Sequence, residues 1–279
     1  MFLGYNTNGF AHHRLEDAIE VLFGLGYEGV AITPDVNHLD PDGPNFDEQV
    51  VKLARSLSDG DFRCVIETGA RFILDTRQKH QPTLISSDSV GRGVRAGLLS
   101  HCVQLAQRLS AECVSFWSGT PDDGAAPSEL MNRLVEGCKR LADYAAERSV
   151  RLAFEPEPGM FIDTMDKFAE LHARVNHPAF GLTVDVGHLV CNRELPVSKF
   201  LAEWKHVLWN VHIEDMRAGV HDHLMFGEGE VNFADVFAGL RAANYRGGVY
   251  VELSRHSYDA VNTARKAMAF LAPFLAQPR

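Results

Sequence analysis

Three carboxylates and one histidine stand where short apolar segments in the second half of the chain end. They are Glu155, Asp185, His212 and Glu252. A single carboxylate at such a position is most often a loop residue or a helix cap, and a single histidine is most often part of the core. Four together are different, because converging carboxylates repel one another and are costly to desolvate unless a cation neutralises them. We therefore expect these residues to bind one divalent metal ion and to leave positions open for a substrate.

The donor atoms indicate which ions would fit. Three carboxylates and one imidazole form an oxygen-rich set of mixed nitrogen and oxygen character. Such a set fits manganese, magnesium, cobalt or iron. It does not resemble a structural zinc site, whose ligands are mostly thiolates.

The four side chains can converge only if their strands run side by side in one direction. Apolar, often β-branched segments typical of strands recur at 2–7, 27–33, 62–68, 113–118, 151–157, 180–186, 207–213 and 247–253. Segments that could be helical follow them at 15–25, 47–58, 94–109, 128–147, 164–175, 197–203, 233–243 and 258–275. Strands that alternate with helices predict right-handed crossovers and a parallel sheet. Eight such units of about 35 residues predict a single-domain α/β protein, a (β/α)8 TIM barrel over residues 1–279, with its chemistry at the C-terminal ends of the strands.

The main alternative is an open, doubly wound sheet, which shows the same alternation. A nucleotide-binding version would need G-x-G-x-x-G directly after a strand and at the start of a helix. The segment 24–29 has that spacing, but it closes a predicted helix and opens a predicted strand. We interpret it as a helix end followed by a turn, and we favour the barrel.

Composition excludes several classes of protein. Lys plus Arg number 27 and Asp plus Glu 37, a net charge of −10, so nonspecific electrostatic binding to nucleic acid or an anionic membrane is disfavoured. Neither an apolar run of about 18 residues nor a basic segment followed by an apolar one is present, so we expect no transmembrane helix and no signal peptide, and a cytoplasmic location. The five cysteines show no C-x-x-C spacing and are expected to be buried and free.

The region 151–252 carries the most specific motifs. These are FEPEPG at the end of the fifth predicted strand, VDVGH at the sixth, VHIED at the seventh with an arginine shortly after it, a G-E-G loop, and VEL at the last. Together they resemble the sugar isomerase/epimerase superfamily of xylose isomerase-like barrels, which includes ketose 3-epimerases, hydroxypyruvate isomerase and inosose-processing enzymes. The resemblance covers nearly the whole chain in architecture but does not indicate the substrate.

The resemblance implies a role for particular residues. One divalent ion, with Mn²⁺ favoured over Mg²⁺, Co²⁺, Fe²⁺ or Zn²⁺ and with no other cofactor, would be held by the four residues named above. The catalytic pair would be Glu155 and Glu252, on opposite faces of a sugar that passes through a metal-stabilised enediolate. Substrate hydroxyls would be contacted by His188 and Arg217. Relatives of this type are commonly dimers or tetramers, so we also expect a homo-oligomer.

Other residues have two interpretations each. Glu157 could reach a substrate hydroxyl or cap a loop. His221 and His223 resemble the place where apurinic endonucleases draw additional zinc ligands, and they could contact substrate or metal or belong to a solvated loop. The third and fourth predicted strands end without the histidines those enzymes use, so a trinuclear zinc site looks incomplete.

The first half of the chain offers fewer signals. The loop from Arg71 to His80 could bind a carboxylate or phosphate of the substrate, or could be a solvated basic loop. Trp117 and Phe10 could form an apolar wall against a sugar ring, or simply pack.

Three functions follow from these observations. The leading prediction is a metal-dependent isomerase or epimerase of a sugar or another small polyhydroxylated carbonyl compound. The first alternative is a lyase or dehydratase that acts on a keto-sugar, an inosose or a dehydroshikimate-like compound. The second is a non-catalytic barrel that binds a metabolite.

Overall fold

The computed structural model describes residues 1–276, and within them eight parallel strands close into a barrel. The strands are β1 (Phe2–Asn6), β2 (Gly29–Ile32), β3 (Arg63–Glu67), β4 (Val114–Phe116), β5 (Leu152–Phe154), β6 (Phe180–Asp185), β7 (Leu208–Ile213) and β10 (Gly248–Val251). Around the ring they follow the order β1-β10-β7-β6-β5-β4-β3-β2, so each strand pairs with its neighbours in the chain and β10 closes onto β1. The predicted TIM barrel is confirmed.

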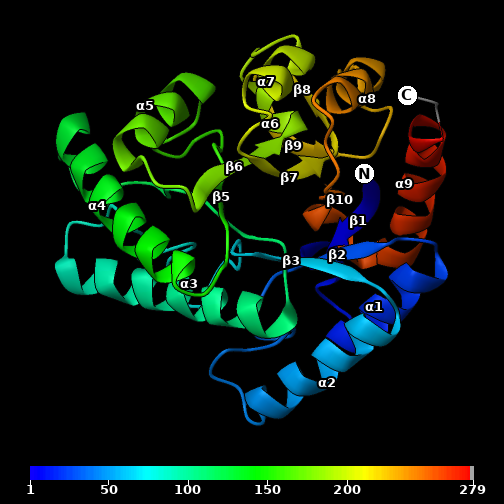
Figure 1. The fold of residues 1–279 in the computed structure, drawn as a ribbon, viewed down its shortest axis with the longest axis horizontal. Helices are drawn as coiled ribbons and strands as arrows, with labels where there is room; N and C mark the ends of the chain where they lie inside the picture. Colours follow the sequence, from blue (N-terminus) through cyan, green and yellow to red (C-terminus); the bar gives the residue numbers. More distant parts are fainter. Residues whose placement is uncertain (277–279) are drawn as a thin grey trace.

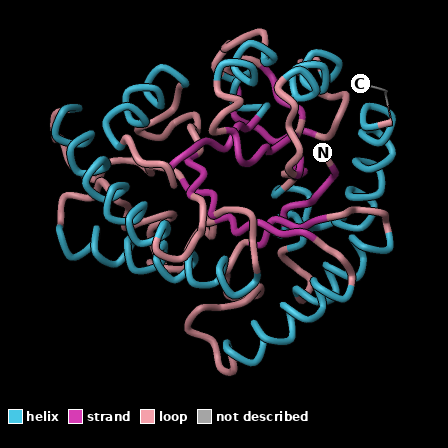
Figure 2. The backbone as a smooth tube through the Cα atoms, in the orientation of Figure 1, coloured by secondary structure: helices cyan, strands magenta, loops and turns pink. Residues whose placement is uncertain are grey.

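Helices form an outer layer around the ring of strands, as Figures 1 and 2 show. They are α1 (Leu15–Gly24), α2 (Phe46–Asp59), α3 (Ser89–Leu109), α4 (Pro127–Ala146), α5 (Met165–Val175), α7 (Val197–Glu203), α8 (Phe233–Ala242) and α9 (Ala260–Leu275). The segment 24–29 closes α1 and opens β2, as the sequence indicates. Gly26 has φ +90°, a conformation that a residue with a side chain rarely adopts.

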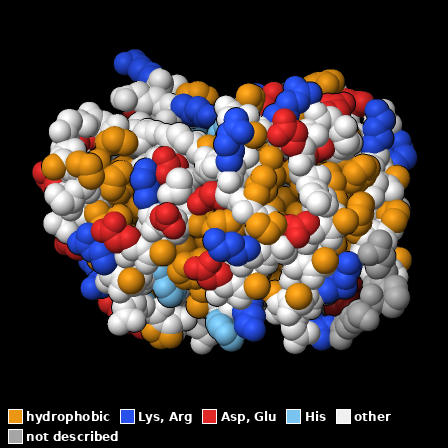
Figure 3. Space-filling view, turned by 90° about the horizontal axis from the view of Figure 1, so that it is seen from above, with side chains coloured by type: hydrophobic (Ala, Val, Ile, Leu, Met, Phe, Trp, Pro, Cys, Tyr) orange, Lys and Arg blue, Asp and Glu red, His pale blue; other side chains and the backbone are white. Residues whose placement is uncertain are grey.

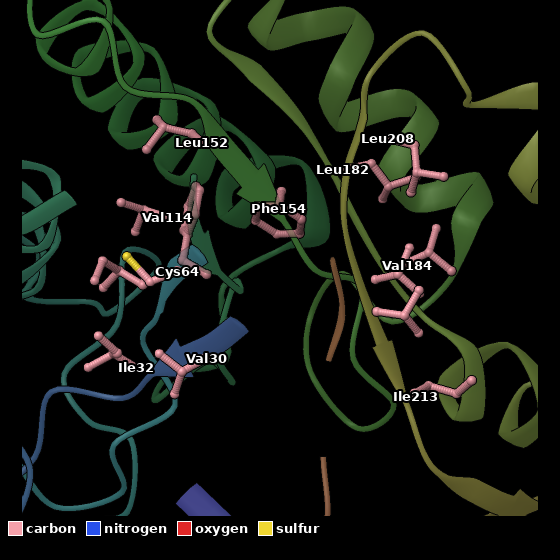
Figure 4. Packing of buried hydrophobic residues seen from close by; sticks show 14 of the residues in the cluster. Val30, Ile32, Cys64, Val114, Leu152, Phe154, Leu182, Val184, Leu208 and Ile213 are labelled. Atoms are coloured by element: carbon pink, nitrogen blue, oxygen red, sulfur yellow. The ribbon is translucent and has the colours of Figure 1, made fainter. Parts of the chain in front are cut away.

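Side chains of the strands alternate between two apolar layers, because successive residues of a strand point to opposite faces. Val30 and Ile32 of β2 belong to the large cluster between barrel and helices, some of whose members are drawn in Figure 4. Ala31, between them, belongs to a small cluster inside the barrel, together with Val65 and Tyr250. Every second residue of a strand therefore points into the barrel. The last of these residues in each strand lies at the C-terminal mouth of the barrel.

Short elements that the sequence did not predict surround that mouth. They are α6 (Val186–Cys191), β8 (Asp215–Arg217), β9 (Val220–Leu224), and two 3₁₀ helices, η1 (Thr7–Phe10) and η2 (Ser254–Asp259). The carboxylate of Asp185 accepts a hydrogen bond from the backbone N–H of His188 (2.8 Å) and caps α6.

Asp215, the first residue of β8, connects the two-stranded β8–β9 sheet to the G-E-G loop. Its carboxylate accepts hydrogen bonds from the backbone N–H groups of Gly227 (2.8 Å) and Val231 (3.1 Å), which fixes the G-E-G loop beside the hairpin. A Cβ atom on Gly229 would lie 2.3 Å from an oxygen of the same carboxylate. The aspartate of VHIED therefore positions a loop.

The surface and the cysteines agree with the composition. All five cysteines are buried and free, as expected. Among the described residues, no helix has the length and apolar character needed to cross a membrane. Acidic and basic side chains are interspersed on the face shown in Figure 3.

Candidate metal and substrate site

The four predicted metal ligands converge at the mouth of the barrel. One donor atom from each of Glu155, Asp185, His212 and Glu252 lies within 4.8 Å of the others. Asp185 and His212 are register partners on the adjacent strands β6 and β7, and the two glutamates directly follow β5 and β10. All four occupy interior positions at the ends of contiguous strands, so strand parity and barrel closure bring them together.

His212 lies at the centre of this group and is completely buried. Its Nδ1 atom lies 3.1 Å from Oε1 of Glu155 and 3.0 Å from Oε2 of Glu252. On the other side of the ring, the amide nitrogen of Asn210 donates to Nε2 (3.0 Å). The amide oxygen of Asn210 is buried without a partner. If the Asn210 amide turned over, this oxygen would accept a hydrogen bond from a protonated Nε2, and Nδ1 would be free to bind a metal ion.

Asp185 uses its two oxygens differently. Oδ1 caps α6, whereas Oδ2 is buried without a hydrogen-bond partner. Both carboxyl oxygens of the neighbouring Glu214 are also buried and unpartnered. Burial, and then the charge of Asp185, hold the pKa of Glu214 well above its usual range. Burial and the neighbouring charge therefore favour the neutral form of the Glu214 carboxyl.

Electrostatics distinguish the two glutamates beside His212. Burial raises the pKa of Glu155 to about 8, although His212 opposes the shift. Burial would raise the pKa of Glu252 too, but His212, His223 and His188 together hold it below its ordinary value. Two carboxyls with opposite shifts in one site are typical of an acid–base pair.

Three histidines form a second group beside the first. Donor atoms of His188, His221 and His223 lie within 4.8 Å of one another. Nδ1 of His188 donates to the carbonyl of Pro156 (3.1 Å), so its Nε2 carries a lone pair toward Nε2 of His221 (3.1 Å). Burial lowers the pKa of His188, and also that of His221 to about 4, where His188 and His223 add to the effect. These two imidazoles are neutral at neutral pH and present ring nitrogens to whatever binds there.

A cavity of about 390 Å³ opens over both groups. We call Glu155, Asp185, His212 and Glu252 the metal set. The cavity is lined by its two glutamates and also by Glu157, His188, His221 and His223, so the structure brings these predicted residues to one place. Arg217 is not among the residues that line the cavity. It is exposed and donates to the carbonyl of Glu228 (2.8 Å), so its contact with a substrate stays a prediction.

The loop 71–80 forms part of the rim. Arg71, Lys79 and His80 line the cavity, and the ring of His80 packs 4.8 Å from that of Trp117, which lines it too. The buried Arg95 donates to the carbonyl of His80 (2.7 Å) and holds this end of the loop in place. Phe10, in contrast, is fully buried in the core.

Sequence reasoning missed several polar residues of the site. Glu67 at the end of β3, Thr33 after β2 and Asn8 in η1 all line the cavity, and the buried Glu214 neighbours Asp185. Glu67 ends an apolar segment, as the predicted metal ligands do, and this position was a usable signal. Asn8 and Thr33 carry no charge and give no comparable signal.

Known proteins resemble this chain in sequence and fold. The family model described as xylose isomerase-like TIM barrel matches residues 19–274. L-ribulose-5-phosphate 3-epimerase UlaE of Salmonella paratyphi C is 27% identical over 190 residues, which are 68% of this chain. The matched segment covers 66% of that relative's own length.

Solved structures show the same barrel. D-allulose 3-epimerase from Methylomonas sp. superposes with a TM-score of 0.77 at 20% identity, over 98% of each chain. The IOLI protein, whose structure contains a zinc atom, superposes with a TM-score of 0.77 at 16% identity over 99% of this chain and 100% of its own. Because the family model spans nearly the whole barrel, the chain belongs to the xylose isomerase-like TIM barrel family.

Proposed function

We propose that the chain is a divalent-metal-dependent isomerase or epimerase that acts on a sugar or another small polyhydroxylated carbonyl compound. The observation that carries the proposal is the position of two glutamates, Glu155 and Glu252, 3.1 and 3.0 Å from one nitrogen of His212. Two carboxyls that face one small volume can take a proton from a carbon and return one from the other side. The relatives named as ribulose-phosphate and allulose epimerases support the same class.

The residues present fit a divalent ion. Oδ2 of Asp185 is a buried oxygen without a partner, and such a charge is costly unless a cation compensates it. Glu155, Asp185, His212 and Glu252 would hold the ion, and the predominance of oxygen donors favours Mn²⁺. When bound, the ion would polarise the substrate carbonyl and make the neighbouring C–H bond more acidic.

Residues of the chain would then move the proton and hold the substrate. One of Glu155 and Glu252 removes a proton from the carbon beside the carbonyl, and the other returns one. Return to the same carbon gives epimerisation, whereas return to the neighbouring carbon gives isomerisation. His188, Glu157 and His223 line the same cavity and would bind substrate hydroxyl groups.

Solvent-isotope exchange tests the proposal directly. Protein loaded with Mn²⁺ is incubated in D₂O with a panel of ketoses, aldoses, inososes and 3-keto sugars, and deuterium is sought at the carbon beside the carbonyl. We expect incorporation with at least one compound and at least a 100-fold slower rate in Glu252→Gln, since a positioned acid or base contributes about 10²–10⁴-fold. Absence of exchange with every compound, or an unchanged rate in the variant, would refute the proposal.

Product analysis separates the reaction types. Epimerisation and isomerisation conserve the mass and the ultraviolet spectrum of the substrate. Elimination releases water and produces a conjugated enone with new ultraviolet absorbance, so that result would favour the lyase alternative.

A further inference from the structure

Glu67 is a buried carboxyl on the side of the cavity opposite the metal set. It is the last residue of β3. Because it lies two residues after Val65, its side chain is on the same, interior face of the strand. The metal ligands belong to the contiguous strands β5, β6, β7 and β10, whereas β3 lies on the remaining arc with β1, β2 and β4. Glu67 is 3% exposed and still lines the cavity.

Hydrogen bonds hold this carboxyl in a fixed position. Oε2 of Glu67 lies 2.9 Å from the hydroxyl of Thr33, which in turn lies 3.0 Å from Oδ1 of Asn6. The same Oδ1 accepts from the backbone N–H of Asn8 (3.2 Å), and the side-chain amide of Asn8 donates to Oε1 of Glu252 (3.0 Å). The single hydroxyl hydrogen of Thr33 serves either Glu67 or Asn6, so these contacts form two neighbouring groups. One places Glu67 beside Thr33, and the other places Asn8 beside the proposed catalytic Glu252.

The backbone also makes room for the carboxyl. A Cβ atom on Gly69 would lie 2.9 Å from Oε1 and 3.0 Å from Oε2 of Glu67, closer than such contacts normally are. The conformation of Glu67 thus depends on a residue without a side chain two positions later. Only a glycine leaves the carboxyl free to face the cavity without displacement.

No cation in the described part of the chain forms an ion pair with Glu67. Burial, and then the charge of Glu252, raise the pKa of Glu67 to about 7. A buried carboxyl without a cation costs free energy and adds no packing that an apolar side chain would not supply. Such a group in a cavity is typical of a binding or catalytic position.

We propose that Glu67 contacts the substrate and binds a hydroxyl group on the carbon chain beyond the end that the metal set engages. The proposal rests on the proposed function and names the substrate more closely, as a polyhydroxylated chain that is uncharged next to Glu67. A phosphate or carboxylate at that point would lie beside a buried carboxyl, with no cation among the described residues that pairs with Glu67 to compensate it. An anionic group of the substrate would have to lie farther out, at the rim near Arg71 and Lys79, which are exposed and line the cavity.

The test combines changes in the protein with changes in the substrate. Mn²⁺-loaded wild type, Glu67→Leu and Glu67→Gln are compared on a ketose and on its analogues that lack one hydroxyl each. A hydrogen bond to a charged group corresponds to about a 10- to 100-fold effect. With the wild type, we expect kcat/KM for one analogue to be about 10- to 100-fold lower than for the intact ketose. With Glu67→Leu, the same analogue should lose less than threefold. Glu67→Gln should give an intermediate loss, because its amide can still bind a hydroxyl.

Two controls separate this contact from a structural role. Thr33→Val removes the hydroxyl that holds Glu67 and keeps the side-chain shape, so it should weaken the same discrimination by a smaller factor. Glu136→Gln changes an exposed carboxyl on α4 and should change nothing. Bound Mn²⁺ should stay at the wild-type level in every variant, because Glu67 is outside the metal set. If Glu67→Leu does not fold, Glu67→Gln and Thr33→Val decide the question.

Calorimetric titration of the same compounds distinguishes failure of this inference from failure of the proposed function. Hydroxyl-dependent binding that Glu67→Leu abolishes, without any turnover, would support the contact and refute the epimerase proposal. Turnover with the same penalty for every deoxy analogue in wild type and Glu67→Leu would overturn the contact alone. Absence of both turnover and binding across the panel would overturn both.

Discussion

The two oxygens of Asp185 allow metal binding to be separated from local stability. Oδ1 caps α6 at 2.8 Å from the N–H of His188, and Oδ2 has no partner and belongs to the proposed metal set. Asp185→Asn keeps a cap oxygen and replaces Oδ2 by an NH₂ group, which cannot bind a cation but can donate to the unpartnered carboxyl of Glu214. Asp185→Ala removes both functions.

The expected magnitudes follow from linkage and from capping. An ion at 100 times its dissociation constant stabilises the native state by about 2.7 kcal/mol. For a domain of this size, about 1 kcal/mol corresponds to roughly 2–4 °C in Tm, so Mn²⁺ should raise the wild-type Tm by about 5–10 °C. Loss of a helix cap costs about 1 kcal/mol, so metal-free Asp185→Ala should melt about 2–4 °C below the wild type. Metal-free Asp185→Asn should melt at or slightly above it.

Calorimetric melting curves in EDTA and in Mn²⁺ measure all of these quantities. Both variants should lose the rise in Tm with Mn²⁺, and only Asp185→Ala should show a lower Tm in EDTA. The reasoning is refuted if Asp185→Asn keeps the full stabilisation by Mn²⁺, because Oδ2 would then not be a ligand. The assignment of Oδ1 as the cap of α6 is refuted if the two metal-free variants melt at the same temperature.

Three further predictions concern the same site. Because burial holds the pKa of Glu155 at about 8 in the metal-free protein, binding of Mn²⁺ must release a proton at neutral pH, and the affinity should rise up to about tenfold per unit between pH 6 and 8. Titration in two buffers of different ionisation enthalpy measures this, and an affinity independent of pH would contradict it. Asn210→Leu should weaken Mn²⁺ binding about 10- to 100-fold, since the imidazole of His212, a proposed metal ligand, loses its hydrogen-bond partner; unchanged binding would argue against that role. Gly187→Ala places a Cβ atom 1.9 Å from Oε1 of Glu214 and should cost about 1–3 kcal/mol in urea unfolding. Gly97→Ala, in the interior of α3 and with no atom within 4 Å, should instead raise stability by about 0.5–1 kcal/mol.

Much of the fold and the metal set could be predicted from sequence because both depend on local patterns. Apolar segments with a polar residue at the end are visible in the letters, and barrel closure then places Glu155, Asp185, His212 and Glu252 together without further information. The segment 24–29 could be assigned correctly for the same reason, since its position between helix and strand is a local property.

The remaining features depend on contacts that sequence spacing does not record. The six-residue helix α6 exists because Asp185 caps it, and a helix so short has little periodicity to detect. The polar contacts of Thr33 with Asn6 and Glu67 join segments that only the closed barrel brings together. Arg217 could be assigned a role only through the resemblance, and its contact with a substrate stays a prediction; in the structure its guanidinium donates to the carbonyl of Glu228.

The order of strands around the barrel divides the catalytic mouth into two arcs. Strands β5, β6, β7 and β10 carry the metal set, whereas β1 to β4 and their loops supply Asn8, Thr33, Glu67 and the rim from Arg71 to His80. All four proposed metal ligands are thereby encoded after codon 150, whereas Glu67 and the basic rim are encoded in the first 80 codons. Random mutagenesis confined to codons 60–80 would vary one wall of the proposed substrate site without changing any proposed metal ligand.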